Sequence, residues 1–324
     1  MPDPPLEQSG SVVVGVDVGG TFTDAVVVTG GRIVTAKVPS TPDDQSVGVV
    51  QSVLLALARA GLTPRQVTRF AHGMTVGTNA LLEGTGAPIA LITTEGFADV
   101  IEIRRQDRAH LYRLDIHHPP PLVPRARRFE VDERCGPLGV LKPLDENSVD
   151  VVVAAVRQSG VEAVAVGLLF SFIHPEHELH IRGALRAALP GVHVSLSSEV
   201  LPEIREYERI STTCVDAHLA PVLGGYLDAL GTRAREAGLP VPAIMQSNGG
   251  LIDLDAAARH PAWTVLSGPA AGVIGAAHIA RFVGIPDVLT FDMGGTSCDV
   301  ALVEGDPART TQTTINGHPL HLPM

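Results

Sequence analysis

The stretch "GVDVGGTFTDAVVV", Gly15–Val28, combines an apolar strand, a glycine pair and two aspartates, and it decides how the rest of the chain is interpreted. The same pattern returns far downstream as "TFDMGGTSCDVALV", Thr290–Val303. Each copy is predicted to form a strand, a tight turn and a second strand. The copies align residue for residue: Asp17 with Asp292, Gly19 with Gly294, Gly20 with Gly295, Thr21 with Thr296, and Asp24 with Asp299.

The residue types in each copy suit a nucleotide phosphate tail and its metal ion. Glycine permits positive φ and leaves backbone N–H groups uncovered, and successive N–H groups form a concave anion site. A threonine hydroxyl can donate to a phosphate oxygen, and an aspartate at a strand end can hold Mg²⁺ directly or through water. One such hairpin is a common structural turn. Two copies facing each other predict a clamp around the phosphates, although neither a dinucleotide fingerprint nor a P-loop motif is present.

Composition narrows the class of protein. The chain has 324 residues, enough for about two domains, and 45% of them are hydrophobic, so it can bury a core. A formal net charge of −11 argues against a nucleic-acid partner. The three scattered cysteines favour a reduced, cytoplasmic chain. The opening "MPDPPLEQSG" lacks the features of a signal peptide, and the longest apolar run, about Ala163–Ile173, is too short for a bilayer.

Strands and helices are predicted to alternate along the chain, which indicates an α/β fold with a mixed sheet. His117–Arg134 is rich in proline and is predicted to cross the surface without regular structure. The predicted strands are Val12–Asp17, Ala25–Thr29, Arg32–Val38, Arg69–His72, Pro88–Thr93, Ala163–Leu169, Val192–Leu196 and Ala243–Gln246. The predicted helices are a segment that begins near Thr41 or Asp43 and stops at Gly61, then Val76–Glu83, Glu146–Ser159, Glu176–Leu189, Glu203–Ala237 with an interruption at Pro221, and Gly268–Arg281.

The paired hairpins resemble the superfold of actin, sugar kinases and heat-shock-protein-70 ATPases. The small-residue helix "SGPAAGVIGAAHIA", Ser267–Ala280, strengthens this resemblance, because that superfold places such a helix just before its second phosphate hairpin. The resemblance implies one complete N-terminal domain and part of a second. Small residues let helix backbones approach closely, so no ligand is assigned to Gly268 or Ala271.

Longer segments resemble the hydantoinase A / 5-oxoprolinase family, in family order, from about Val12 to Met324. They include "HGMTVGTNALLEGTGAPIALITTEGF", "IEIRRQDR", "SSEVLPEIREYERISTTCVDAHLAPVL", "IMQSNGGL" and "TVLSGPAAGV". The resemblance implies a disordered tail at 1–10, the family's N-terminal domain at 11–196, and the start of its hydantoinase A domain at 197–324. The family continues for a long second half after the second hairpin, so this chain resembles a truncated or split member, and its activity alone is an open question.

The resemblance also implies ATP and Mg²⁺ as cofactors, a cyclic amide or ketone substrate, a hydantoinase B-type subunit as partner, and an oligomer without nucleic acid or membrane. Phosphorylating the amide oxygen from ATP would activate a hydantoin or 5-oxoproline ring for opening. The candidate catalytic residues are Asp17, Asp292 and His72, the last because it follows a predicted strand and opens a helix, a position typical of a site residue. The implied cofactor-binding residues are Gly19, Gly20, Thr21, Thr23, Gly294, Gly295 and Thr296, and the implied metal ligands are Asp17, Asp24, Asp292 and Asp299.

Several alternatives stay open at this stage. The protein is either the ATP-using subunit of a cyclic amide hydrolase, with a ketone carboxylase subunit as chemical variant, or a non-catalytic fragment. "HPEHELH", with His174, His177 and His180, suits an ordinary helix start better than a metal site. Arg205 and Arg209 in "EIREYER" belong either to a solvated charge ladder or to an anion site. Cys298 stands where the family usually has threonine.

Overall fold

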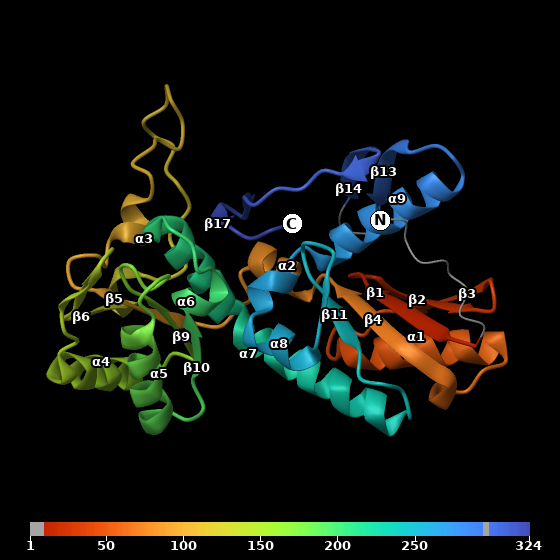
Figure 1. The fold of residues 1–324 in the computed structure, drawn as a ribbon, viewed down its shortest axis with the longest axis horizontal. Coiled ribbons are helices and arrows are strands. Elements are labelled where there is room, and N and C mark those ends of the chain that lie inside the picture. Colours follow the sequence, from red (N-terminus) through yellow and green to blue (C-terminus); the bar gives the residue numbers. More distant parts are fainter. Residues whose placement is uncertain (1–9, 294–297) are drawn as a thin grey trace.

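The computed structural model describes residues 10–293 and 298–324. Two lobes lie side by side, and one long helix, α7 (Glu206–Glu236), runs from one to the other (Figure 1). The first lobe holds a six-stranded sheet and the second a four-stranded sheet. Residues 1–9, most of the predicted tail, lie outside the described residues.

The first sheet has the strand order β12-β11-β4-β1-β2-β3. Buried valines alternate along β1, and their side chains face α1 and α7, which contact each other. Asp44 rather than Thr41 or Asp43 caps α1, because its carboxylate accepts the Ser46 N–H at 3.1 Å. The helix ends at Gly61 as predicted, at a φ of 73°. These elements are β1 (Val12–Val18), β2 (Phe22–Thr29), β3 (Arg32–Pro39), β4 (Val67–Met74), β11 (Ala243–Met245), β12 (Leu251–Ile252) and α1 (Gln45–Ala60).

The second sheet is parallel throughout, in the order β10-β9-β5-β6. Every residue of β5 and β9 is buried, because helices cover both faces of a parallel sheet. The predicted irregular crossing at His117–Arg134 is wrong over its last part, where β6 pairs with β5. These elements are β5 (Ile89–Thr94), β6 (Arg128–Val131), β9 (Ala163–Gly167), β10 (His193–Leu196), α4 (Glu146–Ser159) and α5 (Glu176–Ala188).

Helix α7 is continuous through Pro221, so the predicted interruption is wrong. A proline inside a helix removes one backbone hydrogen bond. Here the helix packs against β9 and β10 of one lobe and against α1 and α2 of the other. Its buried apolar residues on either side of the proline, such as Leu219 and Leu223, hold the backbone in register. Tertiary packing therefore outweighs the local preference for a break.

The first sheet takes strands from both predicted domains, because β11 and β12 follow residue 197 and pair onto β4 and each other. After β12 the chain builds the helix α9 and a separate three-stranded sheet, β13-β14-β15, above the first lobe (Figure 1). The remaining elements are α2 (Val76–Glu83), α3 (Val100–Ile103), β7 (Arg134–Gly136), β8 (Gly139–Lys142), α6 (Ser197–Val200), α8 (Leu254–Arg259), α9 (Ser267–Phe282), β13 (Asp287–Met293), β14 (Cys298–Glu304), β15 (Asp306–Pro307), β16 (Thr313–Ile315) and β17 (His318–Leu320).

The helical stretch Pro261–Phe282 is long and apolar enough to cross a bilayer by length and composition alone, with a mean hydropathy of 1.2. In the fold, α9 packs against β4, β11 and β13. Its first residues, Ser267 and Gly268, are buried against the end of β4. The close approach to β4 accounts for a small residue at Gly268, where a Cβ would stand 3.0 Å from the Thr75 methyl group.

Candidate functional site

The two hairpins that repeat in sequence also repeat in register. Asp17 lies opposite Asp24 across β1 and β2, and Asp292 lies opposite Asp299 across β13 and β14. Cross-strand partners project from the same face of a sheet, so each hairpin presents a pair of carboxylates on one face. The structure therefore supports the alignment of the two sequence copies.

Helix α9 brings the leading aspartates of the two hairpins to one place. The Ser267 hydroxyl donates to the Met74 carbonyl at 2.9 Å, which fixes the start of the helix to the end of β4. The Asp17 Oδ1 atom lies only 3.5 Å from where a Cβ on Gly268 would stand. One helical turn later, Asp292 Oδ2 lies 3.8 Å from the corresponding point on Gly272. The small residues of α9 thus leave room for both carboxylates.

The negative charges of these carboxylates repel one another. The pKa of Asp17 is raised to about 6 by burial, then by the Asp292 carboxylate and then by Asp24. The Asp17 side chain is nevertheless exposed to solvent. Surrounding protein groups therefore reduce the hydration of its carboxylate but leave it open to a ligand. The pKa of Asp299 is also raised, by burial and then by Asp292. A bound cation would relieve this repulsion.

Hard oxygen donors with space beside them fit Mg²⁺. Among the described residues, no three of these carboxylates bring oxygen atoms within 4.8 Å of one another. This spacing fits an ion that is held by one or two carboxylates and completes its shell with water and phosphate oxygens, as Mg²⁺ does. Asp17 and Asp292 would hold this ion. Asp24 and Asp299 lie opposite them on the neighbouring strands β2 and β14.

The close approach at Gly268 gives a stability prediction. Gly268→Val places a side chain 3.0 Å from the Thr75 methyl group and beside Asp17. We expect a loss of about 1–3 kcal/mol in the free energy of unfolding, because the tight packing there resists added volume. Gly275→Val on the same helix is the control, since nothing lies within 4 Å of a Cβ there. Urea unfolding measures both, and equal effects would contradict the close approach.

The turn of the first hairpin departs from the expected backbone. Gly19 and Gly20 do not have the positive φ that glycine permits in such a turn. The Gly19 N–H donates to the Phe22 carbonyl at 3.0 Å, so this N–H closes the turn and is not free for a phosphate. A Cβ on Gly19 would stand 3.2 Å from that carbonyl oxygen, which explains the glycine. Gly20 and Thr21 are exposed at the tip, whereas Gly294, Gly295 and Thr296 lie outside the described residues.

Two further predicted ligands of the first hairpin differ in environment. Thr23 is fully buried on the opposite face of β2, with its hydroxyl 3.2 Å from that of Ser40. It alternates with Asp24 along the strand and cannot face the same ligand, so its assignment as cofactor-binding is wrong. Asp24 lies on the carboxylate face and forms an ion pair with Lys37.

His72 lies within strand β4, not between a strand and a helix as the sequence suggested, and it is fully buried. Its Nε2 lies 2.6 Å from the Tyr226 hydroxyl and its Nδ1 lies 3.3 Å from the Val16 carbonyl. Burial lowers the pKa of His72 to about 4, so the imidazole is neutral. It joins β4 to α7 beneath the sheet, on the face away from Asp17, and we remove it from the catalytic set.

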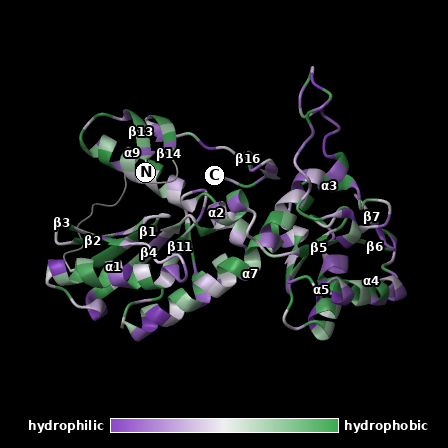
Figure 2. Ribbon diagram, turned by 180° about the vertical axis from the view of Figure 1, so that it is seen from behind, coloured by the Kyte–Doolittle hydropathy of each residue, from purple (hydrophilic) through white to green (hydrophobic). Residues whose placement is uncertain are grey.

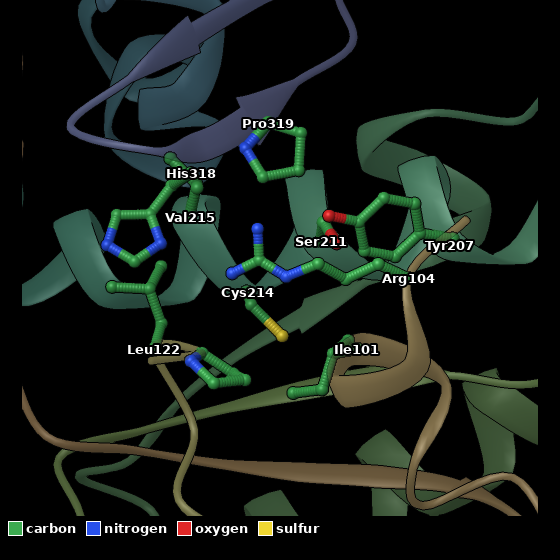
Figure 3. A pocket seen from close by; sticks show the side chains of 10 residues that line it. Ile101, Arg104, Leu122, Tyr207, Ser211, Cys214, Val215, His318 and Pro319 are labelled. Atoms are coloured by element: carbon green, nitrogen blue, oxygen red, sulfur yellow. The ribbon is translucent and has the colours of Figure 1, made fainter. Parts of the chain in front are cut away.

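A small recess lies between α3, α7 and β17, and its lining shows a feature that the sequence did not single out (Figure 3). Arg104 extends into it beside Tyr207, Ser211 and His318. Arg104 has φ 57° and ψ −133°, a strained backbone for a residue with a side chain. A guanidinium with neighbouring hydroxyls suits a carboxylate or a carbonyl oxygen. The segment "IEIRRQDR" was the only signal for it in the sequence.

Arg209, an open candidate from the sequence, is part of the core. It is fully buried and donates to the Leu168 carbonyl at 2.7 Å, the Glu203 carbonyl at 3.0 Å and the Ser197 hydroxyl at 3.2 Å. The buried Glu178 carboxylate accepts from the same Ser197 hydroxyl at 2.7 Å. The Arg209 guanidinium therefore donates to groups of the protein itself rather than to a ligand. Arg205 starts α7 at a φ of 83°.

This two-lobed α/β chain with its acidic hairpins matches known protein families and solved structures. The sequence model of the hydantoinase/oxoprolinase N-terminal region matches residues 13–189, and the hydantoinase/oxoprolinase model matches 209–324. Among solved structures, a nucleotide-free acetone carboxylase, described as catalysing ATP-dependent acetone carboxylation, matches with a TM-score of 0.89 and 28% identity, over 97% of this chain and 47% of that one.

Sequence relatives agree. The caprolactamase alpha subunit of Pseudomonas jessenii is 37% identical over 90% of this chain and 43% of its own length. A solved structure of the ATP-dependent caprolactamase from that organism matches with a TM-score of 0.82 and 34% identity, over 96% of this chain and 47% of that one. The 5-oxoprolinase of Saccharomyces cerevisiae is 32% identical over 91% of this chain and 26% of its own length.

Both solved structures are described as ATP-dependent enzymes, and the matches define the family of this chain. The chain belongs to the hydantoinase/oxoprolinase family. It spans about half the length, or less, of the relatives that it matches.

Proposed function

We propose that this chain is the ATP-using part of a cyclic amide hydrolase, in which ATP phosphorylates the oxygen of a hydantoin-, lactam- or 5-oxoproline-type ring. The observation that carries this is the position of Asp17 and Asp292, from two hairpins of the same register, beside glycines one helical turn apart on α9. The relatives named caprolactamase and 5-oxoprolinase support the amide class. The duplicated hairpin supports assignment to the actin-like ATPase superfold, and the three unpaired cysteines favour a cytoplasmic location.

Phosphoryl transfer depends on positioning and on neutralising charge, and needs no covalent nucleophile from the protein. Mg²⁺ would supply that neutralisation when bound at the carboxylates. Asp17 and Asp292 would set its position, and the exposed tip at Gly20 and Thr21 would contact phosphate oxygens. The Arg104 recess would hold an acyl oxygen or carboxylate of the substrate if further protein brings it toward the phosphates.

One face of the second hairpin suggests how the site is completed. Its acidic face points to α9, and the other face exposes large apolar side chains. Figure 2 shows where β13 and β14 lie beside α9. Phe291 is 64% exposed and Met293 is 70% exposed. Exposed apolar patches mark interaction sites. We propose that this face is covered by additional protein, either a further segment like that of the longer relatives or a B-type subunit. The exposed apolar residues of the hairpin are Leu289, Phe291, Met293, Val300 and Leu302.

Phosphate release from ATP, measured with and without candidate substrates, tests the proposal. The chain is assayed alone and together with a hydantoinase B-type subunit. Stimulation by a lactam, hydantoin or 5-oxoproline is expected. Stimulation only by a ketone with bicarbonate would instead favour the carboxylase alternative that the acetone carboxylase match supports. Failure to bind Mg²⁺–ATP in any of these mixtures would reduce the chain to a non-catalytic fragment.

A further inference from the structure

A second group of metal-binding side chains lies in the other lobe, away from the acidic hairpins. Glu133 lies between β6 and β7, Cys135 lies on β7, and His177 lies in the first turn of α5. One ligand atom from each lies within 4.8 Å of the others. Glu133 and Cys135 are buried, and the His177 side chain is 14% exposed.

The geometry distinguishes a metal site from a cysteine nucleophile with a histidine base. In a catalytic triad, one ring nitrogen faces the nucleophile and the other faces the acid. Here the same atom, His177 Nδ1, lies 2.9 Å from Glu133 Oε2 and 3.6 Å from Cys135 Sγ. A cysteine sulfur, an imidazole nitrogen and a carboxylate oxygen that converge on one point form a chelating set.

The spacing suits a tetrahedral ion. With metal–ligand bonds of about 2.0–2.3 Å, neighbouring ligand atoms stand roughly 3.3–3.7 Å apart. The nitrogen–sulfur separation of 3.6 Å lies in this range, and the nitrogen–oxygen separation of 2.9 Å needs a small opening. His177 reaches the surface and gives an ion a route to the site.

Outer groups hold the carboxylate in place. The other oxygen of Glu133 accepts a hydrogen bond from the Thr94 hydroxyl. The Thr94 oxygen in turn accepts the Leu169 N–H at 3.1 Å. Such outer hydrogen bonds orient ligands in metal sites. We propose that Glu133, Cys135 and His177 bind one Zn²⁺, with water at the fourth position, and that the ion ties the β6–β7 segment to α5.

The proposal changes the interpretation of the histidine-rich segment "HPEHELH". Only His177 of its three histidines joins the cluster. His180 lies 3.0 Å from Glu146 instead. The other two ligands come from about 40 residues earlier in the chain, and the spacing within the segment therefore gave no sign of the site.

Cobalt titration of the metal-stripped full chain tests the site, because Co²⁺ bound to a thiolate gives a charge-transfer absorption that an oxygen-only site lacks. We expect one equivalent of tetrahedral, thiolate-bound Co²⁺ that Zn²⁺ displaces. His177→Ala and Cys135→Ser should each weaken binding at least ~10-fold. Cys298→Ser, beside the acidic hairpins, and His180→Ala are controls that should leave the absorption unchanged.

The assignment does not depend on Cys135→Ser and His177→Ala alone, which could fail to fold. The chain has three cysteines, so retention of the thiolate band in both Cys214→Ala and Cys298→Ser assigns it to Cys135. Absence of a thiolate band in the unmodified chain overturns the proposal. Loss of the band in Cys298→Ser, with retention in Cys135→Ser, overturns it as well.

Discussion

Replacing Asp17 with asparagine is expected to weaken Mg²⁺-dependent ATP binding by about 10–100-fold. The reason is the loss of a charged oxygen ligand, since hydrogen bonds and contacts to charged groups contribute about 1.5–3 kcal/mol. Calorimetry with ATP in the presence and absence of Mg²⁺ measures the change. Asp306→Asn is the control, because its side chain is 89% exposed on β15 and pairs only with Arg281 among the described residues. Equal affinities in the Asp17 variant and the unmodified chain would remove the proposed site.

The same substitution is expected to stabilise the metal-free protein. The pKa of Asp17 is about 6 in the fold against 3.8 for a free carboxyl, so the folded state binds the extra proton between these values. Stability of the unmodified chain therefore falls as pH rises from about 4 to about 6. Asp17→Asn removes this loss and should gain on the order of 1 kcal/mol at pH 7, after allowance for solvent screening. Thermal unfolding at pH 4 and pH 7 checks it: a gain that is equal at both values would contradict the cause.

Removal of the buried Arg209 guanidinium is expected to have the largest effect on stability. Arg209→Ala should cost about 3–5 kcal/mol, because it removes the positive charge near the buried Glu178 carboxylate and leaves the Leu168 and Glu203 carbonyls without their donor. A typical domain has only about 5–15 kcal/mol in total. Denaturant unfolding measures the loss.

Arg182→Ala is the matched control for this prediction. Arg182 pairs with Glu199 at 2.6 Å, but the Glu199 side chain is 38% exposed. A partly exposed pair contributes about 0–1 kcal/mol. A similar loss in the two variants would show that burial of Arg209 does not determine its importance. A loss of ATP binding in Arg209→Lys at unchanged stability would return Arg209 to the list of ligand-binding residues.

The sequence was sufficient for features that depend on neighbouring residues. The helices Val76–Glu83 and Glu146–Ser159 have the predicted bounds, because periodicity and glycine stops are local signals. The repeated hairpin was visible because its residues are contiguous, and so was the family. Even the burial of Thr23 was implicit in the alternation of a strand, in which Thr23 and Asp24 must face opposite sides.

Features that join distant segments required the tertiary structure. The continuity of α7 at Pro221 depends on two lobes that pack against it, and the burial of His72 depends on Tyr226, 154 residues later. Asp17 and Asp292 both lie beside α9 because Gly268 and Gly272 leave room for their carboxylates. The Glu133–Cys135–His177 group arises because β7 and α5 pack together. Residue types state what chemistry is possible, but distance and desolvation decide which groups act together, and both arise from packing between elements far apart in the chain.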